Sequence, residues 1–243
     1  MKIRVFPGYD EMCGAAADFI IARVTRRPSG LLCFPSGDTP TGILDRLVEA
    51  SRAGRVDFSG CRFVGLDEWT GLNGQDEGSC RHYLDERFYL PLRIGQDRIH
   101  FFDGAAYDLQ RECERINGFL REHGPVDLAM VGVGENGHVG LNEPGTGMEQ
   151  YAHVSELQDH TRKVAEKYFQ EKVTLSRGIT LGPKNLLESR TLVMIASGQK
   201  KAQVMARALQ EPVTPECPAG LIRLHADGHV FLDREAAARL SPL

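Results

Sequence analysis

The chain has 243 residues, of which 42% are apolar and 26% are charged, and its formal net charge is −4. These values are typical of a globular protein, and we expect residues 1–243 to form one domain with a sizeable core. The slight negative charge excludes the basic field that nucleic acids and anionic membranes attract, so an anionic ligand needs a local cluster of donors.

The sequence also predicts where the protein works. No apolar run approaches the roughly 20 residues that cross a bilayer, and the N-terminus lacks the layout of a signal peptide. Six scattered cysteines without a C-x-x-C pair indicate reduced, mostly buried thiols: Cys13, Cys33, Cys61, Cys80, Cys113 and Cys217. We therefore expect a cytoplasmic protein without a nucleic-acid or membrane partner.

The first half of the chain predicts strands that alternate with helices. The apolar spacing indicates, in chain order, a strand at 2–6, a helix at 9–26, a strand at 31–34, a helix from about residue 40, a strand at 62–66, a helix near 79–88, a strand near 99–102 and a helix at 106–123.

The second half continues this alternation. An apolar strand at 126–133 is followed by a glycine-rich turn, a polar helix at about 159–170, a strand at 191–196, a helix at 198–209, and strands at 221–224 and 229–232. Strands separated by helices of ten or more residues predict an α/β fold, a single domain with a mainly parallel, Rossmann-like sheet and helices on both faces.

The turn at residues 132–145 carries the densest set of reactive groups. Within eight residues it presents an amide, an imidazole and a carboxylate, from Asn136, His138 and Glu143. An imidazole with a carboxylate to orient it suggests an acid–base pair, although a lone histidine is more often structural. A dinucleotide motif would open directly into a helix, which Pro144 opposes. No histidines have metal-ligand spacing, so we predict no metal and no cofactor.

A second motif precedes the helix expected from about residue 40. Ser36, Gly37, Asp38 and Thr39 place backbone N–H groups and two hydroxyls at a helix N-terminus, where a phosphate binds well. The segment lacks the lysine of a Walker A loop. The alternative interpretation is an ordinary helix cap.

Asp67 follows the strand at 62–66 and precedes Trp69. This position predicts a partly desolvated general base with a raised pKa, while the alternative is a carboxylate that caps the next turn. The motifs after the strands at 31–34, 62–66 and 126–133 all lie at carboxyl ends of strands, where α/β sheets bind their ligands.

Residues 66–69 and 134–144 together resemble the glucosamine-6-phosphate deaminase (isomerase) family. Residues 36–40 and 198–202 fit the same pattern, and the resemblance extends from the first strand to about residue 209. Three details are similar to the galactosamine-6-phosphate branch: Trp69, Leu141 and residues 176–182.

The resemblance implies a mechanism and a substrate, a small phosphorylated amino sugar. His138, oriented by Glu143 and Asn136, would help to open the pyranose ring. Asp67 would move the proton on carbon 2 to carbon 1 through an enolamine, and ammonia would leave from carbon 2 to give a ketose phosphate. The phosphate would rest on the loop of Ser36, Gly37, Asp38 and Thr39, with Lys201.

The chain departs from the family pattern at three positions. Asn136 stands where many members have aspartate, so we expect Glu143 to raise the pKa of His138, but less than two carboxylates would. Asp38 replaces a small residue and would repel the phosphate unless its side chain turns away. Lys167 stands where many members have a phosphate-binding arginine. Lysine cannot form the bidentate hydrogen bonds of a guanidinium, so we expect Lys167 to be a weaker candidate for binding the phosphate than Lys201.

Two other functions compete with this interpretation. A 6-phosphogluconolactonase resembles the chain up to the histidine but lacks the following Asn-Glu-Pro, so Glu143 argues against a lactonase. A catalytically silent sugar-phosphate sensor would have lost its base, yet Asp67 is present. The sequence leaves both epimers at carbon 4 and a homo-oligomer open.

Overall fold

A seven-stranded sheet forms the centre of the computed structural model, which describes residues 1–169 and 175–241. Every pairing in this sheet is parallel, and the strand order is β1-β10-β9-β6-β2-β3-β5. The strands are β1 (Lys2–Phe6), β2 (Leu31–Cys33), β3 (Arg62–Val64), β5 (Ile99–His100), β6 (Leu128–Val131), β9 (Leu192–Ala196) and β10 (Gly228–Asp233).

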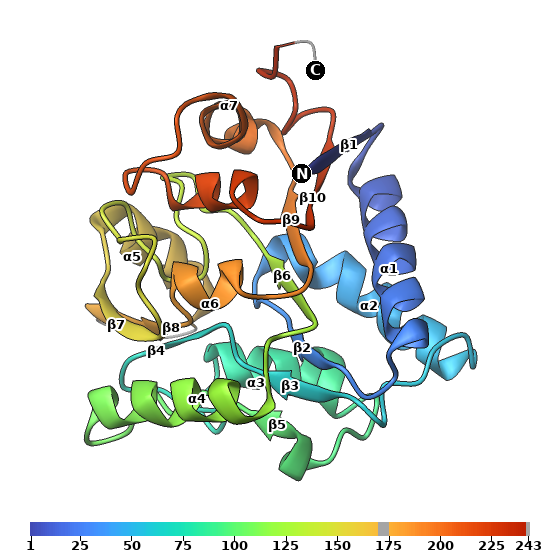
Figure 1. Ribbon diagram of the computed structural model, residues 1–243, viewed down its shortest axis with the longest axis vertical. Coiled ribbons are helices and arrows are strands. Elements are labelled where there is room, and N and C mark those ends of the chain that lie inside the picture. Colours follow the sequence, from blue (N-terminus) through green and yellow to red (C-terminus); the bar gives the residue numbers. More distant parts are fainter. Residues whose placement is uncertain (170–174, 242–243) are drawn as a thin grey trace.

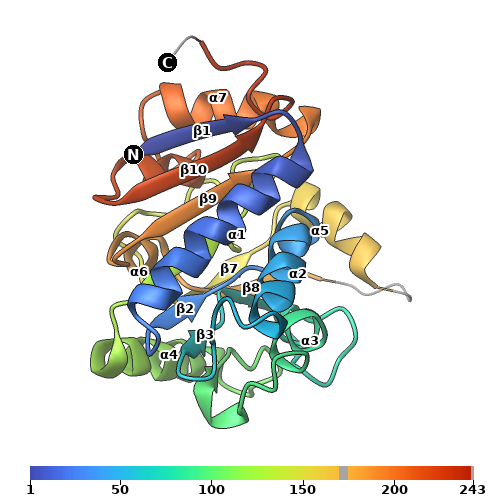
Figure 2. The same cartoon turned by 90° about the vertical axis from the view of Figure 1, so that its right-hand side faces the viewer.

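Helices cover both faces of this sheet (Figures 1 and 2). Because strand side chains alternate between faces, Leu32 packs in the same core cluster as the buried residues of α1 (Tyr9–Arg26) and α2 (Asp38–Arg52), and its neighbour Leu31 packs on the other face. The helices on that second face are α4 (Leu109–His123), α6 (Pro183–Leu187) and α7 (Ala202–Gln210). The predicted fold class is confirmed.

A small antiparallel sheet stands apart from the main one. It pairs β4 (Asp67–Trp69) with β8 (Arg177–Thr180), and β8 with β7 (His153–Glu156). Its strands have only three or four residues and come from distant parts of the chain, so local periodicity did not predict it. This sheet matters for function because it holds Asp67 opposite Thr180.

Two helical boundaries differ from the prediction. The helix expected near 79–88 consists of α3 (Cys80–Leu84) followed by π-helical η1 (Asp85–Tyr89). The helix expected at 106–123 begins at Leu109, because the Asp108 carboxylate accepts a hydrogen bond from the Arg111 N–H at 3.0 Å and caps it.

The strand predicted at 221–224 is wrong. Residues 218–223 form the 3-10 helix η5 (Pro218–Arg223), which begins at a proline and packs five buried residues under α7. A short apolar run suits either a strand or a buried helical turn, and Pro218 favours the turn.

Two more predicted helices are shorter than expected or combine α-helical and 3-10 helical parts. The polar helix consists of α5 (Asp159–Ala165) and 3-10 helical η3 (Glu166–Tyr168), and its predicted end at Gln170 lies outside the described residues. The helix predicted at 198–209 consists of η4 (Gln199–Lys201) and α7, and a further 3-10 turn, η2 (Gln96–Arg98), precedes β5.

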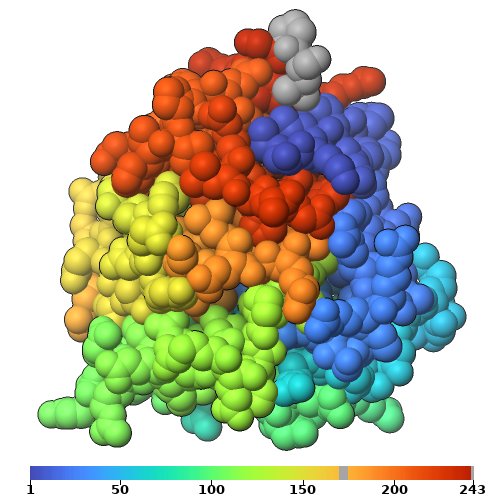
Figure 3. Space-filling view, viewed as in Figure 1, coloured from blue at the N-terminus to red at the C-terminus, as the bar shows by residue number. Residues whose placement is uncertain are grey.

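Segments from the two ends of the chain share one surface. Figure 3 shows the N-terminal segment in blue against the orange and red C-terminal part, as the pairing of β1 with β10 requires. All six cysteines are buried and carry free thiols, which confirms the predicted burial. Within the described residues, no helix is long and apolar enough to cross a membrane.

Candidate active site

All of the predicted site residues except Lys167, which lies in η3, come from segments that follow four adjacent strands. In the order β9-β6-β2-β3, these strands precede Lys201, the turn at 132–145, the loop at 34–37 and Asp67. Because parallel strands present their carboxyl ends at one edge of a sheet, the four segments converge there. The prediction that the motifs meet at this edge is confirmed.

Glycines in the turn at 132–145 make room for the His138 ring. A Cβ at Gly134 would lie 2.3 Å from Cε1 of the His138 ring, so only glycine lets the ring pack against the loop. Gly137 has a φ of 97°, in the left-handed region that favours glycine. The turn therefore fixes where the imidazole lies.

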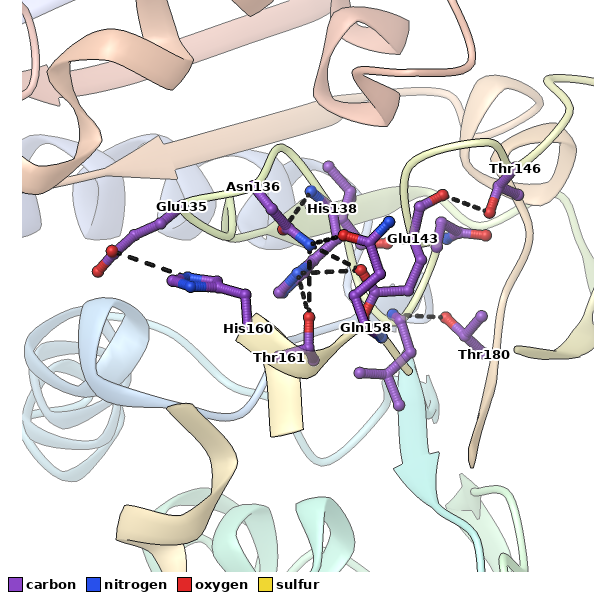
Figure 4. Close-up of polar contacts among 12 residues, drawn as sticks. Glu135, Asn136, His138, Glu143, Thr146, Gln158, His160, Thr161 and Thr180 are labelled. Atoms are coloured by element: carbon purple, nitrogen blue, oxygen red, sulfur yellow. Dashed lines mark hydrogen bonds and ion pairs between the residues drawn. The ribbon is translucent and has the colours of Figure 1, made fainter. Parts of the chain in front are cut away.

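The side chain of Asn136 links the first half of this turn to Glu143 near its end, as Figure 4 shows. The side-chain Nδ2 of Asn136 donates to Glu143 Oε2 at 2.8 Å, and its side-chain Oδ1 accepts from the backbone N–H of His138 at 3.2 Å. Glu143 Oε1 accepts from the Gln158 N–H at 3.3 Å. Glu143 is only 4% exposed, so these donors offset the cost of burying its charge. The contacts fit the predicted orienting role of Asn136.

The contact between Glu143 and His138 is looser than an orienting hydrogen bond. His138 Nδ1 lies 3.9 Å from Glu143 Oε2, and the Thr161 hydroxyl is closer to the same nitrogen, at 3.2 Å. Thr161 also lies 3.5 Å from the Asn136 amide. Orientation of the imidazole by Glu143 is therefore indirect, through Asn136 and Thr161.

The predicted direction of the His138 pKa is wrong. Burial lowers the pKa of His138, and this effect outweighs the nearby charge of Glu143, which raises it. Lys201 and His160 lower the same pKa further. The imidazole is therefore neutral at neutral pH, a form that accepts a proton on one nitrogen and donates from the other.

Asp67 has the environment predicted for a general base. It opens β4, is 9% exposed, and burial raises its pKa to about 7, against the opposing effect of a hydrogen bond from the Cys80 thiol. A carboxylate with this pKa accepts and returns a proton readily near neutral pH. The raised pKa is confirmed, and the alternative of a carboxylate that caps a turn applies to its neighbour instead.

Glu68 is that capping carboxylate. It is fully buried and accepts hydrogen bonds from the backbone N–H groups of Trp69, Cys80 and Arg81, at 2.8, 3.0 and 3.0 Å. Burial raises its pKa to about 7, although these three donors oppose the shift. Glu68 thus fastens α3 to β4.

The loop before α2 presents an open helix N-terminus. Gly37, with a φ of 110°, precedes the helix, and no side chain caps the first-turn N–H groups. The Tyr83 hydroxyl donates to the Gly37 carbonyl at 2.8 Å and steadies the loop. Free N–H groups and the helix dipole suit a phosphate, so the interpretation as an ordinary side-chain cap does not hold.

Asp38 turns toward a cation. Its carboxylate pairs with the Lys167 ammonium at 2.5 Å, and the two side chains are 73% and 48% exposed. The predicted repulsion of a phosphate is thereby reduced. Lys201 is partly buried in η4, where burial lowers its pKa, and the charges of Lys167 and Asp38 also act on it. The two predicted lysines and Asp38 therefore lie around one region.

A cavity of about 200 Å³ adjoins this loop. Its walls include Ser36 and Gly37 from the loop, Trp69 from β4, Tyr83 from α3 and Tyr168 from η3. Among the described residues, no group of three or more histidine, cysteine or acidic side chains is arranged to hold a metal.

Four residues of the site were not predicted. Thr161 and Gln158 contact the His138 network from the β7–α5 segment, and Cys80 contacts Asp67. The Thr180 hydroxyl accepts from the Leu141 N–H at 3.2 Å and so joins β8 to the turn at 132–145. Glycines around β8 were the only sequence signal for this contact.

The sequence matches the family described as glucosamine-6-phosphate isomerases/6-phosphogluconolactonase over residues 9–232. A glucosamine-6-phosphate deaminase of Clostridium botulinum (strain Alaska E43 / Type E3) is 31% identical over 243 residues, which is 100% of this chain and 98% of that protein. One from Geobacillus sp. (strain WCH70) is 34% identical over 97% of this chain and 94% of its own length.

Solved structures agree with these sequence matches. A monomeric glucosamine-6-phosphate deaminase superposes with a TM-score of 0.95 at 30% identity, over 98% of this chain and 100% of that one. A 6-phosphogluconolactonase from Trypanosoma brucei reaches a TM-score of 0.75 over 99% and 98% of the two chains, but at 19% identity it shares the fold alone.

Proposed function

Since the chain belongs to the family of glucosamine-6-phosphate isomerases and 6-phosphogluconolactonases, we propose which of its residues carry the reaction. It is an amino-sugar-phosphate deaminase/isomerase. The substrate is a 2-amino-2-deoxyhexose 6-phosphate, glucosamine 6-phosphate or its carbon-4 epimer galactosamine 6-phosphate, and the products are the ketohexose 6-phosphate and ammonia.

His138 opens the ring. Its neutral imidazole takes the proton of the hydroxyl at carbon 1 and returns a proton to the ring oxygen, so the carbon 1–oxygen bond breaks and an aldehyde forms. The low pKa of His138 favours this role, because the neutral ring is ready to accept a proton. Asn136, Glu143 and Thr161 hold the imidazole in place.

Asp67 then moves one proton. It removes the proton from carbon 2 of the open chain while the substrate's ammonium group gives a proton to the oxygen on carbon 1, which forms an enolamine. It then delivers its proton to carbon 1 to give a protonated imine at carbon 2. Water adds to this imine, and ammonia leaves, so the carbon–nitrogen bond is replaced by a ketone. The pKa of about 7 suits both directions of the transfer.

The phosphate binds at the N-terminus of α2. The first-turn N–H groups have no side-chain cap, and Ser36 and Thr39 add hydroxyl donors. Lys201 supplies the main cation and Lys167 a second one, because Lys167 already pairs with Asp38. Binding here leaves carbons 1 and 2 at the other end of the sugar for Asp67 and His138.

The observation that carries the proposal is the buried Glu143, which Asn136 holds beside His138. This carboxylate belongs to the Asn-Glu-Pro that the lactonase pattern lacks. A silent sensor is disfavoured because Asp67, buried and with a pKa near neutrality, has the properties of an active base.

The test is to incubate the purified protein separately with glucosamine 6-phosphate, galactosamine 6-phosphate and 6-phosphogluconolactone. We expect one ammonia per ketose phosphate from at least one epimer. The resemblance of Trp69, Leu141 and residues 176–182 to the galactosamine branch makes that epimer essential to include. Rapid lactone hydrolysis with no ammonia from either epimer would overturn the proposal.

We also propose a cytoplasmic location, which the six free, buried thiols support. A homo-oligomer stays a prediction, to be set against a relative described as monomeric. Light scattering on the purified protein measures its mass in solution directly and decides between a single chain and an assembly.

A further inference from the structure

The Thr161 hydroxyl, rather than a carboxylate, is the hydrogen-bond partner of His138 Nδ1 (Figure 4). Thr161 lies in α5 and is 3% exposed, and its Oγ1 is 3.2 Å from Nδ1. The nearer oxygen of Glu143 is 3.9 Å from the same nitrogen, which is beyond hydrogen-bond distance. A hydroxyl and a neutral ring nitrogen can each donate or accept. The direction of this hydrogen bond therefore decides which nitrogen of the ring carries the proton.

The amide of Asn136 indicates that direction. Its Oδ1 accepts from the backbone N–H of His138, and its Nδ2 donates to the carboxylate of Glu143 at 2.8 Å. A backbone N–H only donates and a carboxylate only accepts, so these two contacts leave a single orientation for the amide. Nδ2 also lies 3.1 Å from Gln158 Oε1 and 3.5 Å from Thr161 Oγ1. The hydroxyl of Thr161 thus meets a donor at Asn136, and its proton points elsewhere.

His138 Nδ1 is the only acceptor within hydrogen-bond distance of the Thr161 hydroxyl among the described residues. If Nδ1 carried the ring proton, this hydroxyl would be a buried donor without a partner, which folded proteins avoid. Nδ1 therefore accepts from Thr161, and the proton of the neutral ring lies on Nε2. The His138 side chain is 19% exposed, and in the described part of the chain Nε2 has no hydrogen-bond partner, so it is available to a ligand.

We propose that Thr161 is a positioning residue that sets the tautomer of His138, so that Nε2–H meets the sugar at the start of the reaction. The inference rests on the proposed function, because it takes His138 as the residue that opens the ring. Nε2 gives its proton to the ring oxygen as the bond between carbon 1 and that oxygen breaks, and the hydroxyl proton of carbon 1 moves to Nε2. The imidazole begins and ends this step neutral, with Nδ1 still bound to Thr161.

The first test reads the tautomer of the parent protein without substrate. Long-range proton–nitrogen NMR of isotope-labelled histidine distinguishes a ring protonated on Nε2 from one protonated on Nδ1, and His138→Gln assigns the signal. The measurement is made near neutral pH, where burial keeps the His138 ring neutral by lowering its pKa. We expect the proton on Nε2. A proton on Nδ1 in the parent would overturn the inference, whatever the variants show.

The second test removes the hydroxyl. Thr161→Val keeps the shape of the side chain, and its ring should lose the preference for Nε2–H, because the charge of Glu143 favours a proton on Nδ1. Thr161→Ser keeps the hydroxyl and should restore the parental tautomer. Thr191→Val is the matched control, since Thr191 is also buried and its hydroxyl donates to Asp227 at the opposite edge of the sheet. An unmoved tautomer in Thr161→Val would overturn the inference.

Kinetics separate this role from a purely structural one. Thr161→Val should release ammonia from the cyclic amino sugar phosphate roughly tenfold more slowly, because one hydrogen bond to the imidazole is lost, and Thr161→Ser should restore the rate. Proton exchange at carbon 1 of the ketose phosphate in the presence of ammonium needs Asp67 but not ring opening, so it should keep the parental rate in both variants. Equal losses of release and exchange would indicate a general packing defect and would overturn the inference. Failure of the proposed function is distinguishable, because the parent would then release no ammonia while its tautomer could still be read.

Discussion

The amide of Asn136 donates to the Glu143 oxygen that lies 3.9 Å from His138 Nδ1. The amide and the imidazole thus share one carboxylate oxygen, and the amide holds the shorter contact, at 2.8 Å. Asn136 brings no second negative charge to the site, so burial decides the ionisation of His138 and keeps the imidazole neutral.

Asn136→Ala should lower kcat/KM about 10- to 100-fold, because a hydrogen bond to a buried charged group contributes about 1.5–3 kcal/mol. The rate of ammonia release measures this loss. Asn117→Ala is the control, since Asn117 holds the backbone of Ala152 at 3.2 Å outside the His138 network. Equal losses in both variants would remove Asn136 from the orienting network.

Asn136→Asp should raise the pKa of His138, because it adds a negative charge beside the imidazole. Titration of the His138 ring by NMR measures the shift directly. An unchanged pKa of His138 would mean that a charge at residue 136 does not affect the ionisation of the imidazole.

Lys201→Ala should raise KM by roughly tenfold or more, because a charged hydrogen bond to the phosphate is lost. Lys167→Ala should raise it less, since Lys167 is about half exposed and shared with Asp38. Asp38→Asn should lower KM, because it removes a negative charge from the mouth of the phosphate loop. Lys200→Ala, on the exposed side of the same turn, is the control and should leave KM unchanged. An equal rise in KM for Lys200→Ala and Lys201→Ala would indicate that both lysines only attract the phosphate at long range, and would contradict a direct contact with Lys201.

Asp67→Asn should stabilise the protein increasingly as pH rises. The folded-state pKa of about 7 is above the ordinary aspartate pKa of 3.8, so the folded state binds the proton more tightly than the unfolded state. The stability that this proton contributes is present at low pH and is lost as pH rises through about 7. Asparagine carries no charge at any pH, so the gain in melting temperature over the parent should be larger at about pH 8 than at about pH 5. An equal gain in melting temperature at both pH values would contradict the conclusion that Asp67 is buried and becomes charged near pH 7.

Local sequence signals predicted the main sheet and its helices well. The runs around β2, β6 and β9 are apolar, and the loops that follow them carry Ser36, His138 and Lys201, so their convergence follows from parallel pairing alone. The rest depends on contacts between distant segments. Thr161 and Cys80 enter the site through tertiary packing, and no local pattern marks them. The pKa of His138 was mispredicted because charge is visible in a sequence and burial is not.

The central claim is that Asp67 transfers the proton between carbons 2 and 1, whereas the His138 network opens the ring. Proton exchange at carbon 1 of the ketose phosphate tests this claim most directly. In deuterated water with ammonium present, the imine forms at carbon 2, and exchange at carbon 1 then needs the base but not the opening of the aminopyranose. We expect the parent and Glu143→Gln to exchange at similar rates, Glu143→Gln to release ammonia slowly from the cyclic amino sugar phosphate, and Asp67→Asn to lose exchange by at least ~10²-fold. Exchange by Asp67→Asn at the parent rate would contradict the account.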